Sequence, residues 1–268
     1  FRAYRDAGVR GIFAEVYGYD RGKIPFNELR PYLMSKLTWN PDLDLRALLR
    51  DFHLDYYGPK SGPKMLEFYH AVCDGQDTFE PESFSDQRLE KMERIVRRAL
   101  PLADDDFARR RIQEALRGVV FMRLAKLIGQ WDVQDGVMKN RADAPEAEAL
   151  RQQFNELSEK LGDKDRLTQK DQLFKRAVLE PANDDLKLTV VPESGATVAR
   201  IIDRKTGTDY ALIYPPRSGR LVGGYQELTG FSWSSPGIFT PFKVKTDRKD
   251  KRGHSVTMVS DTVKPGFK

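Results

Sequence analysis

The chain has 268 residues, enough for one large domain or two ordinary ones, and 40% are hydrophobic, which suffices for a packed core. Its net charge is +5, but 45 Lys and Arg residues are intermixed with 40 Asp and Glu residues. No basic face with interleaved aromatics emerges, and no apolar run approaches the ~20 residues of a membrane-spanning helix, so neither nucleic-acid binding nor a membrane span is predicted.

The chain opens with an α-β-α passage typical of an α/β fold. A helix-like tail over residues 1–7 ends at Gly8, and a strand-like run over residues 9–14 leads into the carboxylate Glu15. In α/β barrels the chemistry lies at the carboxyl ends of the strands. A single buried-type strand cannot form a sheet by itself. We therefore expect the chain to be the latter part of a larger protein.

Two predicted helices complete the first region, which ends at about residue 58. The first helix begins near Arg30, with a proline in its first turn, and ends at the Asn40-Pro41 pair. The second is capped by Asp42 or Asp44. Apolar residues at three- and four-residue spacing give this second helix one predicted buried face, formed by Leu45, Leu48, Leu49, Phe52 and Tyr56.

The second region, residues 59–180, is predicted to be helical throughout. Its predicted helices begin at the capping residues Ser61 and Ser85 and then cover residues 104–128, 145–161 and 168–178. Short loops between these elements favour antiparallel packing, so the region is predicted to be a helical bundle.

The third region, residues 181–268, changes from a helical period to the two-residue period of strands. The predicted strands are Leu186–Val191, Thr197–Ile202, Tyr210–Tyr214 and Val256–Val259. Residues 203–207 form a predicted turn. The pattern is typical of a β-sandwich, here a partial one, and the whole chain is predicted to be an α+β multidomain protein.

Several motifs carry a resemblance to a known family. The first region holds Gly11-Ile12-Phe13-Ala14-Glu15, then the series Lys36-Leu37-Thr38-Trp39-Asn40-Pro41-Asp42, and then Phe52 followed by Tyr56-Tyr57-Gly58. This region resembles the end of the catalytic barrel in a family of uncharacterised bacterial proteins. That family is similar to α-glucuronidases and to hexosaminidase-like glycoside hydrolases. The resemblance implies that residues 1–58 are the C-terminal remnant of a (β/α)8 barrel.

The third region resembles a galactose-mutarotase-like sandwich, a domain that often follows the barrel in carbohydrate-active enzymes. The residues that carry this resemblance are 190–195, 203–207 and 223–227. Together the two resemblances imply hydrolysis of glycosidic bonds in a uronic-acid- or amino-sugar-containing glycan. They imply no cofactor, a periplasmic or extracellular location, and a principal catalytic acid upstream of this chain.

Glu15 is the candidate catalytic group, because a glycosidase needs two carboxyl groups that flank the scissile bond. Alternatively, Glu15 hydrogen-bonds sugar hydroxyls, or it forms a structural salt bridge with a neighbour such as Arg21. Only this one carboxylate is evident at a strand end, so the sequence does not predict retention or inversion.

Tyr17, Tyr19 and Trp39 are candidate substrate-binding residues, since aromatic rings can stack on the apolar C–H faces of sugars. For Trp39 the alternative is packing, because a tryptophan at a helix end is often a core anchor. Packing is also the favoured interpretation for Tyr56.

His70 and Cys73 lie three residues apart on one predicted helix, but no second pair exists to complete a metal site, so no metal is predicted. Two other classes of protein remain open. One is a non-catalytic carbohydrate-binding or scaffold protein, and the other is a helical interaction module.

Overall fold

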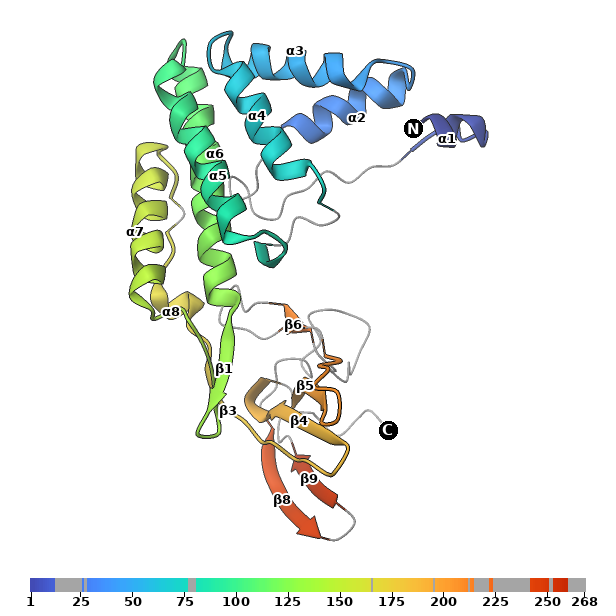
Figure 1. Cartoon of the computed structure of the whole chain (residues 1–268), viewed down its shortest axis with the longest axis vertical. Coiled ribbons are helices and arrows are strands. Elements are labelled where there is room, and N and C mark those ends of the chain that lie inside the picture. The colour runs from blue at the N-terminus through green and yellow to red at the C-terminus, as the bar shows by residue number, and fades with distance from the viewer. Residues whose placement is uncertain are drawn as a thin grey trace. The chain divides into compact units, whose positions relative to one another are not determined.

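The computed structural model describes residues 1–12, 26, 28–76, 81–164, 166–194, 196–211, 213–214, 222–223, 242–250 and 253–259. The chain divides into two compact units. Unit 1 comprises Phe1–Leu124 and Ala149–Leu167, and unit 2 comprises Ala125–Glu148 and Thr168–Lys268. Helices dominate the described part of unit 1 and antiparallel strands that of unit 2 (Figure 1), which confirms the predicted α+β class.

The first four helices of unit 1 begin and end close to where the sequence predicts. They are α1 (Arg2–Asp6), α2 (Leu29–Trp39), α3 (Leu45–Tyr57) and α4 (Gly62–Cys73). Gly8 and Gly58 follow α1 and α3 with φ of 80° and 87°, the left-handed region in which glycine is favoured. Of the two predicted caps for α3, Asp44 is correct, because its side chain accepts a hydrogen bond of 2.9 Å from the amide of Arg46.

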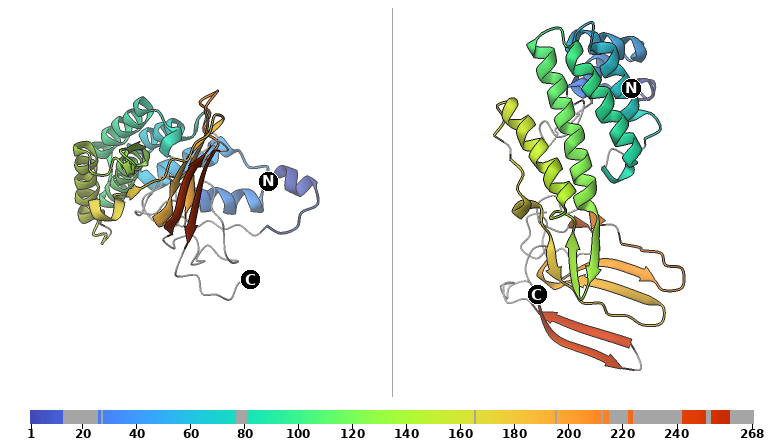
Figure 2. Two further views of the ribbon diagram at one scale, coloured as in Figure 1. Left: turned by 90° about the horizontal axis from the view of Figure 1, so that it is seen from below. Right: turned by 60° about the vertical axis from the view of Figure 1, so that its left-hand side comes forward.

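Three longer helices that lie mainly in unit 1 follow. They are α5 (Asp86–Ala99), α6 (Asp106–Gly129) and α7 (Pro145–Lys160), with short 3-10 turns at Pro81–Ser83 and Leu100–Leu102. Ser85 caps α5 as predicted, since its hydroxyl accepts from the amide of Arg88 at 3.2 Å. Figure 2 shows α6 and α7 side by side, where the rings of Phe121 and Phe154 lie 5.9 Å apart.

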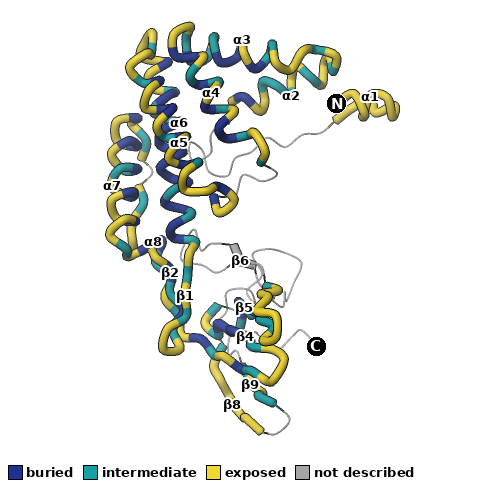
Figure 3. The backbone as a smooth tube through the Cα atoms, viewed as in Figure 1, coloured by how far each residue is buried: buried dark blue, intermediate teal, exposed yellow. Residues whose placement is uncertain are grey.

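Each of these helices has a buried face, which follows the dark stripes of the tube in Figure 3. The buried residues of α5 and α6 include Leu89, Met92, Val96, Ala99, Ile112, Ala115, Leu116, Val119, Met122 and Leu127. In contrast, Leu45 is 45% exposed, so its predicted place on the buried face of α3 is wrong. Leu45 is the first residue of α3, and burial on this helix is concentrated from Leu49 to Tyr57.

Two further predictions for unit 1 need correction. Residues 9–12 of the predicted strand have no regular structure and are exposed, and residues 13–14 lie outside the described part. Exposed backbone groups need a neighbouring strand to form a sheet, and the described part of unit 1 supplies none. Ser61 occupies the cap position of α4 but makes no capping hydrogen bond; its buried hydroxyl donates instead to the carbonyl of Tyr57.

Unit 2 begins with a β-hairpin that the helical prediction for residues 59–180 missed. Strands β1 (Trp131–Gln134), β2 (Val137–Asn140) and β3 (Lys175–Ala177) form an antiparallel sheet. The Asp135-Gly136 turn between β1 and β2 has φ of 50° and 71°, the signature of a tight hairpin. Of the helix predicted over residues 168–178, only α8 (Gln169–Gln172) forms.

The remaining strands pair in twos. They are β4 (Leu186–Val191) with β5 (Thr197–Asp203), β6 (Ile213–Tyr214) with β7 (Val222–Gly223), and β8 (Lys243–Asp250) with β9 (Gly253–Val259). The turn over residues 203–207 is confirmed by the hydrogen bond of 2.8 Å from the amide of Gly207 to the carbonyl of Asp203. The predicted strand Tyr210–Tyr214 is too long, because residues 210–211 lie outside any strand.

A small apolar core joins two of these sheets within unit 2. Met138, Phe174, Val178, Val191 and Ala199 are buried together, with Trp131 and Val133 packed against them. Strand β8 is exposed along its whole length and carries Lys, Arg and Asp side chains. Charged side chains discourage pairing with another chain at such an edge.

Candidate functional site

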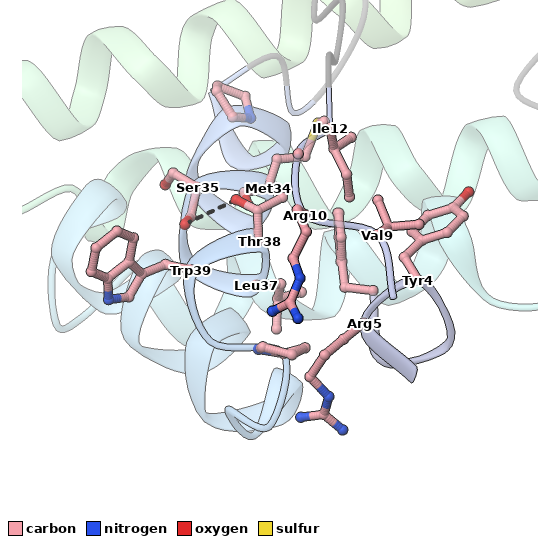
Figure 4. A pocket seen from close by; sticks show the side chains of 14 residues that line it. Tyr4, Arg5, Val9, Arg10, Ile12, Met34, Ser35, Leu37, Thr38 and Trp39 are labelled. Carbon is pink, nitrogen blue, oxygen red and sulfur yellow. Dashed lines mark hydrogen bonds between the residues drawn. The ribbon is translucent and has the colours of Figure 1, made fainter. Parts of the chain in front are cut away.

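Unit 1 contains a solvent-open hollow that we call the α2 pocket. It has a volume of about 540 Å³ and lies among α1, residues 9–12 and α2 (Figure 4). Its lining combines exposed or half-buried apolar and aromatic side chains with two aliphatic hydroxyls and two guanidinium groups. The residues are Phe1, Tyr4, Val9, Ile12, Met34, Leu37, Trp39, Ser35, Thr38, Arg5 and Arg10.

Helix α1 is held in place beside the pocket by polar contacts to the loop after α2. The Nε of Arg2 donates to the carbonyl of Pro41 at 3.0 Å. One guanidinium nitrogen of Arg5 lies 2.6 Å from a carboxylate oxygen of Asp42, and both side chains are exposed. Exposed ion pairs contribute about 0–1 kcal/mol each, so these contacts orient α1 more than they stabilise it.

Trp39 is the most exposed large hydrophobic residue of the pocket, with 92% of its surface accessible. It is the last residue of α2, and its indole extends outward at the rim of the pocket in Figure 4. The alternative that Trp39 is a core anchor is therefore wrong. An indole of this kind presents a free aromatic face to solvent.

Arg10 supplies an uncommitted positive charge next to α2. It is exposed, and among the described residues it has no hydrogen-bond or ion-pair partner. Arg10 lines the pocket together with Leu37 and Thr38, and Figure 4 draws its guanidinium in front of α2. Sequence inspection overlooked Arg10, because it lies inside a predicted strand and belongs to no motif.

The described residues that line the pocket include no Asp or Glu. The hydroxyl of Thr38 donates to the carbonyl of Met34 at 2.6 Å, and that of Ser35 donates to the carbonyl of Tyr32 at 2.8 Å. Both hydroxyl oxygens keep lone pairs that can accept hydrogen bonds from a ligand. These residues can therefore bind a polar ligand, but they contain no carboxyl acid or base.

The other predicted site residues, Glu15, Tyr17 and Tyr19, lie outside the described residues, as does Arg21. Of the predicted substrate-binding residues, the structure thus describes Trp39.

Tyr56 has a structural role, as favoured from sequence. Its ring stacks on Phe52 at 4.9 Å, and the guanidinium of Arg111 lies 4.0 Å from its centre. Burial raises the pKa of Tyr56 to about 12, so its phenol stays neutral.

His70 and Cys73 show no sign of metal chemistry in the described part of the chain. His70 Nδ1 lies 3.2 Å from a carboxylate oxygen of Asp74. Burial raises the pKa of the Cys73 thiol, which disfavours the reactive thiolate. Among the described residues, no group of three or more His, Cys, Asp or Glu side chains could hold a metal ion.

These features define an α+β protein with an open pocket that offers an aromatic face and cationic donors. Residues 1–70, which include the helices α1 to α3 and the whole lining of the pocket, match a family described as a domain of unknown function (DUF4838). Neither curated proteins nor solved structures gave a match to the chain. None of the described helices is both long and apolar enough to cross a membrane.

Proposed function

We propose that this chain is part of a glycoside-hydrolase-like protein that cleaves glycosidic bonds, and that the α2 pocket binds a sugar of its substrate. The observation that carries the proposal is the 92% exposed Trp39 at the rim of a hollow that also holds the guanidinium of Arg10, which has no ion-pair partner among the described residues. Glycan or oligosaccharide is therefore the proposed partner.

The exposure of Trp39 is the main physical reason. Leaving a large aromatic side chain in water forgoes a burial free energy of about 2–3 kcal/mol. Because a sugar presents apolar C–H groups on one face and hydroxyls at its edge, a ring stacked on Trp39 would cover the indole. Its hydroxyls would then meet the polar groups of Ser35 and Thr38.

The lining favours an acidic sugar over an amino sugar. Arg10 brings a positive charge to the pocket that no carboxylate among the described lining residues balances, whereas Arg5 is already paired with Asp42. A sugar carboxylate can accept charge-assisted hydrogen bonds from a guanidinium, whereas a sugar ammonium would be repelled. Of the two glycan classes that the family resemblance implies, we therefore infer the uronic-acid-containing one.

The finer architecture belongs to the same proposal. Residues 1–58 would be the C-terminal part of a TIM-type barrel, residues 59–180 a mainly helical domain with the β1–β2 hairpin inserted, and residues 181–268 a galactose-mutarotase-like sandwich. A periplasmic or extracellular location follows from the family resemblance.

Replacing Trp39 by alanine is expected to weaken binding of a glucuronic-acid-bearing oligosaccharide at least tenfold, equivalent to about 1.4 kcal/mol. Trp39→Phe should retain part of the affinity, because phenylalanine keeps a smaller apolar face. Isothermal titration calorimetry of the whole protein would measure both. Phe107→Ala is the matched control, since Phe107 is 73% exposed in unit 1 but does not line the pocket. Equal affinities of the Trp39→Ala variant and the wild type would exclude Trp39 as a sugar platform.

Replacing Glu15 by glutamine is expected to reduce turnover of a validated glycan by at least ~100-fold if Glu15 is the catalytic carboxylate, because the amide can neither accept nor supply the proton. Binding should change little. The measurement is steady-state hydrolysis of the glycan by the full-length protein, beside the binding assay above. Unchanged turnover would remove Glu15 from the mechanism.

The second candidate is a non-catalytic carbohydrate-binding protein, which the carboxylate-free lining of the described pocket favours. The same two assays separate the candidates. Binding that depends on Trp39 without any hydrolysis would support the non-catalytic protein, whereas hydrolysis that depends on Glu15 would support the enzyme.

A further inference from the structure

Unit 1 contains a completely buried histidine, one ring nitrogen of which has no hydrogen-bond partner among the described residues. His53, on α3, is completely buried. Its Nδ1 lies 2.6 Å from the carbonyl oxygen of Leu49. A carbonyl only accepts, so Nδ1 carries the hydrogen. The other nitrogen, Nε2, is buried and has no hydrogen-bond partner in the described part of the chain. This geometry fits a neutral imidazole.

The described side chains around His53 include four aromatic rings, which carry no negative charge to pair with an imidazolium. Phe26, Phe52, Tyr57 and Tyr69 have ring centres between 5.5 and 6.2 Å from that of the imidazole. Burial raises the pKa of both tyrosines, that of Tyr69 to about 12, so both phenols stay neutral below that range.

The other groups that act on His53 do not supply a negative charge either. On α4, the positive charge that His70 gains on protonation lowers the pKa of His53. On α3, the carbonyl of Leu49 raises it. The burial of the ring has the largest effect and lowers the pKa of His53. An imidazolium here would lose its hydration, and a cation–π attraction from the rings would only partly offset that loss.

Helices α3 and α4 pack backbone against backbone beside His53. The backbones approach so closely at Gly62 that a Cβ atom there would lie 2.7 Å from the carbonyl oxygen of His53 and 3.0 Å from the Cα of Leu54. Phe26 covers another side of the imidazole. Its φ of 68° is unusual for a bulky residue. Separating α3 and α4 would therefore open one side of the surroundings of the imidazole to water.

We propose that the protonation state of His53 controls the packing of α3 against α4. In the closed form the imidazole is neutral and the two helices are packed; in the open form His53 has taken up a proton and the helices have separated. Mild acid would then loosen the packing of α3 against α4 without any change in ligand. The proposal concerns a conformational device and is independent of the proposed function.

The direction and range of the pH effect follow from proton linkage. The pKa of His53 is lowered in the closed form, whereas an opened, hydrated histidine titrates near about 6.5. The opened form therefore binds more protons below that pH. The closed form is fully stable above about pH 6.5 and loses stability as the pH falls towards the lowered pKa. Over this window each pH unit favours opening by up to about tenfold.

Hydrogen–deuterium exchange of the whole chain between pH 7.5 and 5 tests the proposal. After correction for the intrinsic rates, amides of α3 and α4 in the wild type should show an opening population that grows by up to about tenfold per pH unit below 6.5. His53→Asn keeps a donor for the Leu49 carbonyl but cannot titrate, and His53→Phe fills the volume. Whatever their stability at pH 7.5, both variants should lose this pH dependence. His70→Asn, on the exposed side of α4, should keep it.

Histidine NMR of the wild-type protein gives a second test that does not depend on any variant folding. At pH 7 the nitrogen shifts should show Nδ1 protonated and Nε2 unprotonated. Two results would overturn the proposal. One is an imidazole of His53 that titrates near about 6.5 while α3 and α4 stay protected. The other is an opening of the His53→Asn and His53→Phe variants with the same pH dependence as the wild type.

Discussion

Replacing Gly62 by alanine is expected to destabilise unit 1 by about 2 kcal/mol. The added Cβ would lie 2.7 Å from the carbonyl oxygen of His53 and 3.0 Å from the Cα of Leu54. These are backbone atoms, so no side chain can move aside to make room. Overpacking of this kind costs about 1–3 kcal/mol. In an isolated helix the same change would be favourable by about 0.5–1 kcal/mol. The close approach of α3 and α4 therefore decides the sign.

Urea denaturation followed by far-ultraviolet circular dichroism would measure the change in the free energy of unfolding. Gly11→Ala is the matched control, because a Cβ at Gly11 meets nothing within 4 Å and its backbone is not in the left-handed region. We expect this control to leave the unfolding midpoint almost unchanged. A Gly62→Ala variant as stable as the Gly11→Ala variant would mean that α3 and α4 do not approach as described.

Replacing Asp163 by alanine is expected to cost about 3 kcal/mol of stability at neutral pH. A guanidinium nitrogen of Arg117 lies 2.6 Å from a carboxylate oxygen of Asp163. The Arg117 side chain is only 5% exposed, whereas that of Asp163 is 33% exposed. Removing the carboxylate leaves a buried positive charge without its ionic partner. Losses of about 3–5 kcal/mol are typical of such a change, and the partial exposure of Asp163 favours the lower value.

Replacing the other partner of this ion pair, by Arg117→Met, is expected to lower the free energy of unfolding clearly less than Asp163→Ala does. Methionine removes the buried charge together with the Nε of Arg117, which has no hydrogen-bond partner among the described residues. The remaining carboxylate of Asp163 can be hydrated. The new apolar side chain can still contact Phe154, over whose ring the Arg117 guanidinium lies at 5.8 Å. Urea denaturation of the two variants would measure this asymmetry. Equal losses, or a larger loss for Arg117→Met, would contradict the account of a buried charge held by Asp163.

The helix ends were largely predictable from sequence because their causes are local. Asp44 and Ser85 cap helices by bonding to amides two and three residues away, and glycines at 8, 58 and 162 end helices in the left-handed conformation. Ser61 shows the limit of this reasoning. It has the right residue type and position for a cap, yet its hydroxyl donates a hydrogen bond to the carbonyl of Tyr57 instead.

The β1–β2 hairpin shows a prediction that failed although a local signal was present. The Asp135-Gly136 pair is a strong hairpin turn, but it lies between two long helical patterns that dominated the prediction. The strands themselves gain stability from non-local contacts. Met138 is buried against Phe174, Val191 and Ala199, which lie far along the chain. Those partners cannot be identified from a local period.

The candidate site was predictable only in its residue types. The sequence indicated Trp39 as a sugar platform or a core anchor, and only its exposure in the fold decided between them. Arg10 became a candidate when the fold brought residues 9–12 beside α2. Neither fact is encoded within a few residues of the side chain concerned.

The sequence alone predicted the caps at Asp44 and Ser85, the glycine helix stops, the two-residue period of β4 and β5, and the α+β class, because each depends on interactions between residues close in the chain. The tertiary structure decided which apolar side chains are buried, which charges meet, and which aromatic rings enclose His53. Arg117 and Asp163, for example, lie 46 residues apart and meet only after α6 and α7 pack. Such contacts depend on how whole faces of helices and sheets fit together, and that fit is a property of the folded chain.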